Sequence, residues 1–296
     1  MKEAILHFPA QFLYEPRLEN GPLASGLDHY VVLGMGGSAL AASLLQVAHP
    51  DRSIAVHRDY ALPYISTALR ARTLIIASSY SGNTEEALHG FNAARAAGFP
   101  VVAIATGGRL LERARTTHAP YIALPSVGLQ PRMALGYSMR ALLAAMGDHA
   151  SLSATRALVH VLRPALLEGV GETLASQLHG AVPVIYASAR YAPLGYTWKI
   201  KFNETGKIPA FTNVFPELNH NEMTGFDVAP TTTALAQPFH FLFLRAGDEE
   251  SYIARRMDVL EGLYRDRGLS VTTVALRGDT MYERLFSSVL FADWTA

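Results

Sequence analysis

The chain alternates short apolar runs with longer segments whose apolar residues recur at helical spacing. The runs predict strands, and Gly98-Phe99-Pro100 is typical of a helix end, since glycine suits the position after a helix and proline stops it. Strands are expected at 30–33, 53–57, 72–77, 101–105 and 121–124, and again at 182–187, 239–244 and 271–276. Because strands that alternate with helices pair in parallel, the pattern predicts a doubly wound α/β architecture.

The intervening segments predict the helices and a domain boundary. An amphipathic helix followed by a loop is expected within residues 1–26, and further helices at 38–47, 84–97, from 109, 131–146, 151–180 with a break at Arg163-Pro164, 194–203, 249–267 and from 280. Gly147-Asp148 is the expected boundary between two domains, 1–148 and 149–296. Each domain should be a three-layer structure with a mostly parallel sheet. The second half repeats the strand–turn–helix order of the first without its glycine-rich and serine-rich turns.

Composition narrows the class of protein. The 296 residues are half apolar, and Lys plus Arg equals Asp plus Glu, 25 each, which argues against a nucleic-acid binder. There is no cysteine, so thiolate catalysis and cysteine-ligated metals are excluded. We expect no signal peptide, and the uncharged run 30–47 is interrupted by glycines, which argues against a membrane span. These observations favour a cytoplasmic protein without a membrane partner.

The first candidate site is the turn Gly34-Met35-Gly36-Gly37-Ser38, which directly follows a predicted strand. Glycines let backbone N–H groups approach an anion, and the following helix adds a partial positive charge. Tight packing alone would also explain such a turn. A dinucleotide site is disfavoured, because the third glycine is missing and no convincing acidic ribose partner follows.

A second turn, Ser79-Tyr80-Ser81-Gly82-Asn83-Thr84, has the same plan with hydroxyls in place of glycines. Helix capping is the simplest explanation of such residues, but one cap needs only one of them. Glu85 and Glu86 would repel a phosphate and should point away from it. Since both turns belong at the carboxyl edge of one sheet, where such sheets bind ligands, we expect a phosphate pocket there.

The two turns resemble the sugar isomerase (SIS) domain. Three more segments, in matching order and spacing, narrow the resemblance to the bifunctional phosphoglucose/phosphomannose isomerases, which have two SIS domains. These segments are Pro131–Tyr137, Phe202–Glu204 with Lys207, and Phe215–Glu222. The resemblance covers nearly the whole chain. It implies aldose–ketose isomerisation of glucose 6-phosphate and fructose 6-phosphate, with mannose 6-phosphate as a further candidate, and a place in glycolysis or gluconeogenesis.

The resemblance also implies catalytic roles. Glu204 matches the base that moves a proton between C1 and C2, His220 the ring-opening residue, and Arg132 the cation beside the enediolate. The simpler alternatives are a solvated helix residue for Glu204 and a structural imidazole for His220. The phosphate would be bound by residues of the two turns, namely Gly36, Gly37, Ser38, Ser79, Ser81 and Thr84.

The resemblance implies a homodimer in which His220 reaches the site of the partner subunit, and it requires neither a metal nor another cofactor. His220 with Glu217 and Glu222 is the only local group resembling a metal site, and it lacks the helical histidine spacing of a metalloprotease.

One feature departs from the family pattern. The family continues into a C-terminal helix with a lysine near the site, whereas the last lysine here is Lys207. Three alternatives stay open: His220 opens the ring alone, an arginine such as Arg284 substitutes, or the protein is a non-catalytic phosphosugar-binding module.

Overall fold

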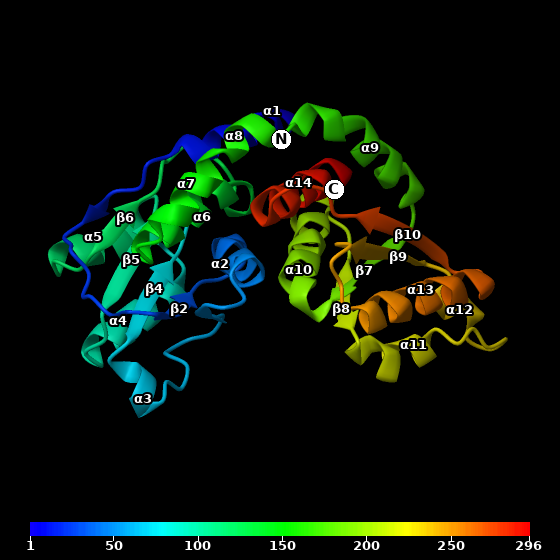
Figure 1. Ribbon diagram of the computed structural model, residues 1–296, viewed down its shortest axis with the longest axis horizontal. Helices are drawn as coiled ribbons and strands as arrows, with labels where there is room; N and C mark the ends of the chain where they lie inside the picture. The colour runs from blue at the N-terminus through cyan, green and yellow to red at the C-terminus, as the bar shows by residue number, and fades with distance from the viewer. The chain divides into compact units, whose positions relative to one another are not determined.

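The apolar runs of the sequence form two separate sheets. The computed structural model describes residues 1–296 and divides into two units, Met1–Leu162 (unit 1) and Arg163–Ala296 (unit 2). Each unit buries its own sheet against helices (Figure 1). The predicted doubly wound fold, with mostly parallel strands flanked by helices, is confirmed.

Unit 1 contains a six-stranded sheet in the order β1-β6-β5-β4-β2-β3. All neighbours are parallel except the edge strand β1. The chain leaves β2 toward β3 and leaves β4 in the opposite direction toward β5, so the switch point lies between β2 and β4. The strands are β1 Leu18–Glu19, β2 His29–Leu33, β3 Ser53–His57, β4 Thr73–Ser78, β5 Val101–Ala105 and β6 Tyr121–Ala123.

Helices cover both faces of this sheet. On one face, Val31 and Ile75 pack with Phe91 of α4 and Leu110 of α5. On the other face, which carries the alternate side chains of each strand, α2 packs with α6. The helical elements are α1 Lys2–Leu6, η1 Phe8–Leu13, α2 Gly37–Ala48, α3 Thr67–Arg70, α4 Glu85–Ala96, α5 Gly108–Thr116, η2 Pro131–Met133, α6 Leu135–Ala145, α7 His149–Arg156 and α8 Leu158–Val161.

Unit 2 contains a four-stranded parallel sheet in the order β10-β9-β7-β8, so its switch point lies between β7 and β9. The strands are β7 Val182–Ser188, β8 Phe211–Phe215, β9 Phe239–Arg245 and β10 Ser270–Ala275. Tyr264 of α13 packs in the core with Tyr186 and Phe241, while α10 contacts β7, β8 and α14.

The four long helices of unit 2, α9, α10, α13 and α14, are those that the periodicity predicts, whereas the short helical turns between them were not predicted. They are α9 Pro164–Gln177, η3 Ala189–Tyr191, α10 Ala192–Lys201, η4 Phe202–Gly206, η5 Glu217–His220, α11 Glu222–Gly225, α12 Thr233–Ala236, α13 Ser251–Asp266 and α14 Met281–Thr295. Here η4 is a π-helical turn that directly continues α10. None of the helices in either unit combines the length and the apolar character that a membrane crossing requires.

Three details differ from the sequence-based expectation. The N-terminal segment forms only the short helices α1 and η1 before the edge strand β1. Strand β8 has no apolar run, because it lies at the sheet edge with Phe211 exposed. The chain divides after Leu162 rather than at Gly147-Asp148, because α7 and α8 pack against η1.

Candidate functional site

The first turn of unit 1 connects β2 to α2. Gly36 has φ +48°, and no side chain caps the helix, so the N–H groups of Gly36 and Gly37 have no partner in the chain. A Cβ on Gly37 would lie 2.5 Å from the backbone N of Arg132, so only glycine lets the segment that contains Arg132 pack against this turn. Unpaired N–H groups at a helix start form an anion-binding site.

Ser38 joins this turn to the second turn across the switch point. The Tyr80 N–H donates to Ser38 Oγ at 2.8 Å, and Ser78 Oγ donates to the Ser38 carbonyl at 3.1 Å. Ser38 is 6% exposed. Because a hydroxyl that accepts one bond still has its own proton to donate, Ser38 fixes the two turns and retains a donor for an anion.

The other predicted hydroxyls form the second turn, which leads from β4 into α4. Ser79 is fully buried, and its Oγ donates to Thr84 Oγ1 at 2.8 Å while accepting from the Gly82 N–H at 3.1 Å. The Thr84 proton is thus available to donate outward, and no side chain caps α4. Ser81 is exposed and accepts from the Asn83 N–H at 3.2 Å. Ser79 therefore organises the turn, whereas Ser81 and Thr84 are placed to donate.

A third loop, after β5, supports the second turn and was not part of the predicted site. Gly82 has φ +72°, and a Cβ there would lie 1.9 Å from the Gly107 carbonyl oxygen. Thr106 Oγ1 donates to the Tyr80 carbonyl at 2.7 Å, and Asn83 Oδ1 accepts from the Arg109 N–H at 3.1 Å. The sequence signal that could have indicated it is Thr106-Gly107-Gly108, which follows a strand.

Tyr80 is a second functional candidate that the sequence argument did not single out. Its phenol oxygen is buried and has no hydrogen-bond partner. Burial, with a smaller effect of Tyr137, raises the pKa of Tyr80, so the phenol stays protonated at neutral pH. A ligand hydroxyl could satisfy this donor.

Arg132 lies in η2, directly beside the first turn. Proline at the start of η2 suits a helix N-terminus, where its missing N–H costs nothing. Arg132 is 8% exposed, and its backbone reaches Gly37 as described above. The structure therefore brings Arg132 and the six predicted phosphate ligands to one edge of the unit 1 sheet.

Glu204 lies in unit 2, in the π-helical turn η4, and is half-buried. Single π-turns are rare and occur often at functional sites. A buried ion pair lies at the start of this turn: Lys201 Nζ is 2.7 Å from Asp293 Oδ1, and both side chains are fully buried. Asn203 Nδ2 donates to the Ile208 carbonyl at 3.0 Å and stabilises the exit.

His220 ends η5 and is exposed, whereas the loop around it is firmly held. Tyr186, buried in the core, donates from its hydroxyl to Glu222 Oε1 at 2.5 Å, and Asn213 Nδ2 donates to Glu222 Oε2 at 2.6 Å. Asn221 Nδ2 donates to Glu217 Oε1 at 2.9 Å. Two neighbours of His220 thus serve to anchor its loop.

Glu204 and His220 lie on opposite sides of β8 along the chain. Glu204 precedes the amino end of this strand, and His220 follows its carboxyl end. Since a parallel strand rises about 3.3 Å per residue, β8 alone spans roughly 16 Å. Arg284, which the sequence analysis considers as a ring-opening candidate, donates to Asp248 Oδ2 at 2.9 Å and to Tyr191 Oη at 3.3 Å, at the carboxyl edge of the unit 2 sheet.

Comparison with known proteins adds independent findings. The family model of the bacterial phospho-glucose isomerase C-terminal SIS domain matches residues 168–296. The bifunctional phosphoglucose/phosphomannose isomerase of Caldicellulosiruptor bescii is 33% identical over 318 residues, which cover 100% of this chain and 91% of that protein. Its counterpart from Thermoplasma acidophilum is 34% identical over 90% of this chain and 81% of its own.

A solved structure shares the fold. Tagatose-6-phosphate ketose/aldose isomerase from Escherichia coli superposes with a TM-score of 0.66 at 16% identity, covering 99% of this chain and 91% of that one.

Proposed function

The chain belongs to the family of bifunctional phosphoglucose/phosphomannose isomerases, and we propose that it interconverts glucose 6-phosphate and fructose 6-phosphate and also accepts mannose 6-phosphate. The two aldoses differ only at C2, so one enediolate intermediate serves both. We place this activity in the cytoplasm, in glycolysis or gluconeogenesis. The observation that carries the proposal is the convergence of Arg132 and the two turns at the unit 1 switch point.

The phosphate would bind where the two turns meet. The N–H groups of Gly36 and Gly37 and the hydroxyls of Ser38, Ser81 and Thr84 are its donors, and Ser79 holds Thr84 in place. Both helix N-termini favour a negative charge at this point. Glu85, the first residue of α4, is exposed, as expected if it avoids the anion.

The remaining roles follow from the chemistry of the family resemblance. Glu204 moves the proton between C1 and C2, and a half-buried carboxylate suits this task. The fixed positive charge of Arg132 stabilises the developing enediolate. An exposed imidazole such as that of His220 can donate or accept a proton near neutral pH during ring opening.

We further propose that His220 acts in the site of a partner subunit of a homodimer. The positions of Glu204 and His220 before and after β8 support this arrangement, because the strand separates them within one chain.

The decisive experiment is coupled turnover of fructose 6-phosphate to glucose 6-phosphate. We expect the Glu204→Gln variant to lose at least about 100-fold in kcat, which is the lower range for removing a positioned proton-transfer group. Glu172→Gln, on the exposed side of α9, is the control and should retain wild-type turnover. If the wild type binds fructose 6-phosphate by thermal shift but never turns it over, the chain is instead a phosphosugar-binding module.

Subunit mixing tests the placement of His220. Glu204→Gln and His220→Ala variants should each be inactive, and refolding them together should restore a substantial part of the activity. One site of each mixed dimer would then contain both native residues. No recovery, with mixed dimers demonstrated by mass spectrometry, would place His220 and Glu204 in the same chain's site.

A further inference from the structure

Unit 2 has a switch point of its own, between β7 and β9. Ligands of doubly wound sheets bind at such a crevice outside the carboxyl ends of the strands. A cavity of about 350 Å³ lies there, bounded by the loops after β7, β8 and β9. Its lining includes Ser188, Arg190, Tyr191 and the three successive carboxylates Asp248, Glu249 and Glu250.

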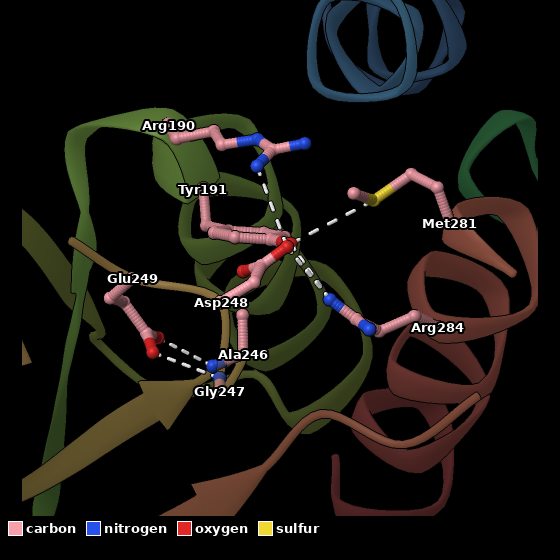
Figure 2. A network of polar contacts seen from close by, with 8 residues as sticks. All are labelled: Arg190, Tyr191, Ala246, Gly247, Asp248, Glu249, Met281 and Arg284. Carbon is pink, nitrogen blue, oxygen red and sulfur yellow. Dashed lines mark hydrogen bonds and ion pairs between the residues drawn. The ribbon is translucent and has the colours of Figure 1, made fainter. Parts of the chain in front are cut away.

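Three donors converge on the carboxylate of Asp248 in this loop cluster. Tyr191 Oη donates at 3.0 Å and Arg284 Nη1 at 2.9 Å, while Arg190 Nη1 lies at 3.4 Å (Figure 2). The donors come from η3 and α14, two elements far apart in the sequence. Two guanidinium groups and a phenol are typical of a site that holds a phosphate, but here they hold an aspartate of the same chain.

Glu249 fills a second set of anion-binding groups beside it. Its Oε1 accepts from the Ala246 N–H at 2.5 Å, and its Oε2 accepts from the Gly247 N–H at 2.8 Å (Figure 2). Successive N–H groups in a turn before a helix form a concave site for an anion. In unit 1 the corresponding turn between β4 and α4 contains no carboxylate.

Two further groups at this switch point have no partner within the chain. Ser188 ends β7, is 7% exposed, lines the cavity, and makes no hydrogen bond through its hydroxyl. Arg284 Nε is buried and also lacks a hydrogen-bond partner. An unsatisfied buried donor such as Arg284 Nε is rare in folded proteins. Together with the Ser188 hydroxyl, which faces the cavity, it gives the site more donors than Asp248 and Glu249 use.

We propose that the switch point of unit 2 is an anion site of the phosphate class, in which Asp248 and Glu249 occupy the positions of a phosphate and keep it closed. As a consequence, the intact chain binds phosphosugar in unit 1 alone, a statement that rests on the proposed function. Like charges placed next to a ligand are an effective means of excluding it.

The test replaces the two carboxylates by the residue types found in unit 1. The variant Asp248→Ser with Glu249→Asn removes both charges and keeps small polar groups. Radiolabelled orthophosphate in equilibrium dialysis then counts the bound equivalents per chain. We expect the wild type to bind one equivalent and the variant two, with at least a tenfold rise in affinity at the second site.

The control is Asp258→Ser with Glu261→Asn, which makes the same change in net charge on α13. Asp258 pairs with Arg245 and Glu261 with Arg265, and neither lines the cavity. This control should keep the wild-type stoichiometry. If it also gains an equivalent, the gain reflects net charge, and the proposal is overturned.

The remaining outcomes are also decisive. A double variant that is folded by circular dichroism but binds no more phosphate than the wild type overturns the proposal, as does a wild type that already binds two equivalents. A wild type that binds none and a variant that binds one supports the closed site and counts against the phosphate site in unit 1. Should the variant not fold, Asp248→Asn with Glu249→Gln preserves the acceptor atoms and permits the same count.

Discussion

The two switch points of this chain share a topology but differ in what fills them. In unit 1, glycine and hydroxyl residues surround unpaired N–H groups, and the two turns contain no charged side chain. In unit 2, the equivalent position holds Asp248 and Glu249, each already bonded to nearby donors (Figure 2). The fold thus determines where a ligand could bind, whereas the turn residues determine whether the place is open.

The helices that follow the first strand of each switch point differ as well. Helix α2 in unit 1 carries no charged residue. Helix α10 in unit 2 buries Lys201 against Asp293 of α14 and then continues into the π-turn of Glu204. We infer that this ion pair fixes the turn, which is a role that α2 does not need.

Breaking the Lys201–Asp293 pair should have the largest effect on stability. Lys201→Met leaves a carboxylate buried without its cation, which typically costs about 3–5 kcal/mol of unfolding free energy. Urea denaturation followed by circular dichroism would measure the loss. For comparison, Ser43→Ala replaces a buried polar residue of α2 in unit 1 by an apolar one, and it should lower the free energy of unfolding far less.

A double replacement separates the electrostatic cause from simple loss of packing. Lys201→Met combined with Asp293→Leu removes both charges, and most of the lost stability should return, because well-packed apolar pairs often replace buried ion pairs at little cost. If the double variant is as unstable as the single one, the pair acts through its shape and hydrogen bonds instead.

A matched pair of glycines tests the two turns directly. Gly82 and Gly247 both have positive φ, +72° and +79°. A Cβ on Gly82 would lie 1.9 Å from the Gly107 carbonyl oxygen, whereas a Cβ on Gly247 would meet open space. We expect Gly82→Ala to lower the free energy of unfolding by about 3 kcal/mol, because a left-handed alanine alone costs about 1–2 kcal/mol and the clash with Gly107 adds to it. Since the clash displaces the second turn, the KM for fructose 6-phosphate should rise at least tenfold.

Gly247→Ala should lower the free energy of unfolding only by the about 1–2 kcal/mol that a left-handed alanine costs. It should leave the KM for fructose 6-phosphate unchanged. Steady-state kinetics and urea denaturation of both variants make the comparison. Equal effects of the two substitutions on KM would mean that unit 2 contributes to phosphosugar binding through its own turn.

The two turns at the unit 1 switch point could be located from the sequence because their signals are local, and their role in binding phosphate stays a prediction. Glycines and hydroxyls stand directly after apolar runs, and their spacing alone indicates two anion-binding turns. The contact of Gly82 with the loop after β5 could not be predicted in the same way, because it depends on packing between segments far apart in the sequence.

The closed site of unit 2 has no comparable local signal. Asp248 and Glu249 look like ordinary solvated residues before a helix, and their partners Tyr191 and Arg284 come from distant segments. The same limit applies to β8, where edge exposure removes the apolar pattern, and to α7 and α8, which pack with unit 1 although they follow a glycine that suggests a boundary. The catalytic roles of Glu204, His220 and Arg132 stay predictions from family resemblance.

The smallest expected effect concerns a feature that the two units share. In unit 1, His29 Nδ1 lies 2.9 Å from Thr73 Oγ1 of the neighbouring strand, and in unit 2 His240 Nε2 lies 2.8 Å from Thr272 Oγ1. Burial lowers the pKa of both imidazoles below the usual 6.5. Each therefore binds a proton more readily in the unfolded chain, so its contribution to stability is complete above pH 6.5 and declines as the pH falls below that value.

Unfolding free energies measured by urea denaturation at pH 7.5 and pH 5.5 should reveal this loss, at most about 1.4 kcal/mol per pH unit for each histidine. His240→Gln should reduce the pH dependence of unit 2, and His29→Gln that of unit 1, whereas His179→Gln at an exposed position serves as the control. A pH dependence that none of these variants changes would assign the acid sensitivity to other groups. Equal reductions by His29→Gln and His240→Gln would show that the two sheets, unlike their switch points, share the same acid response.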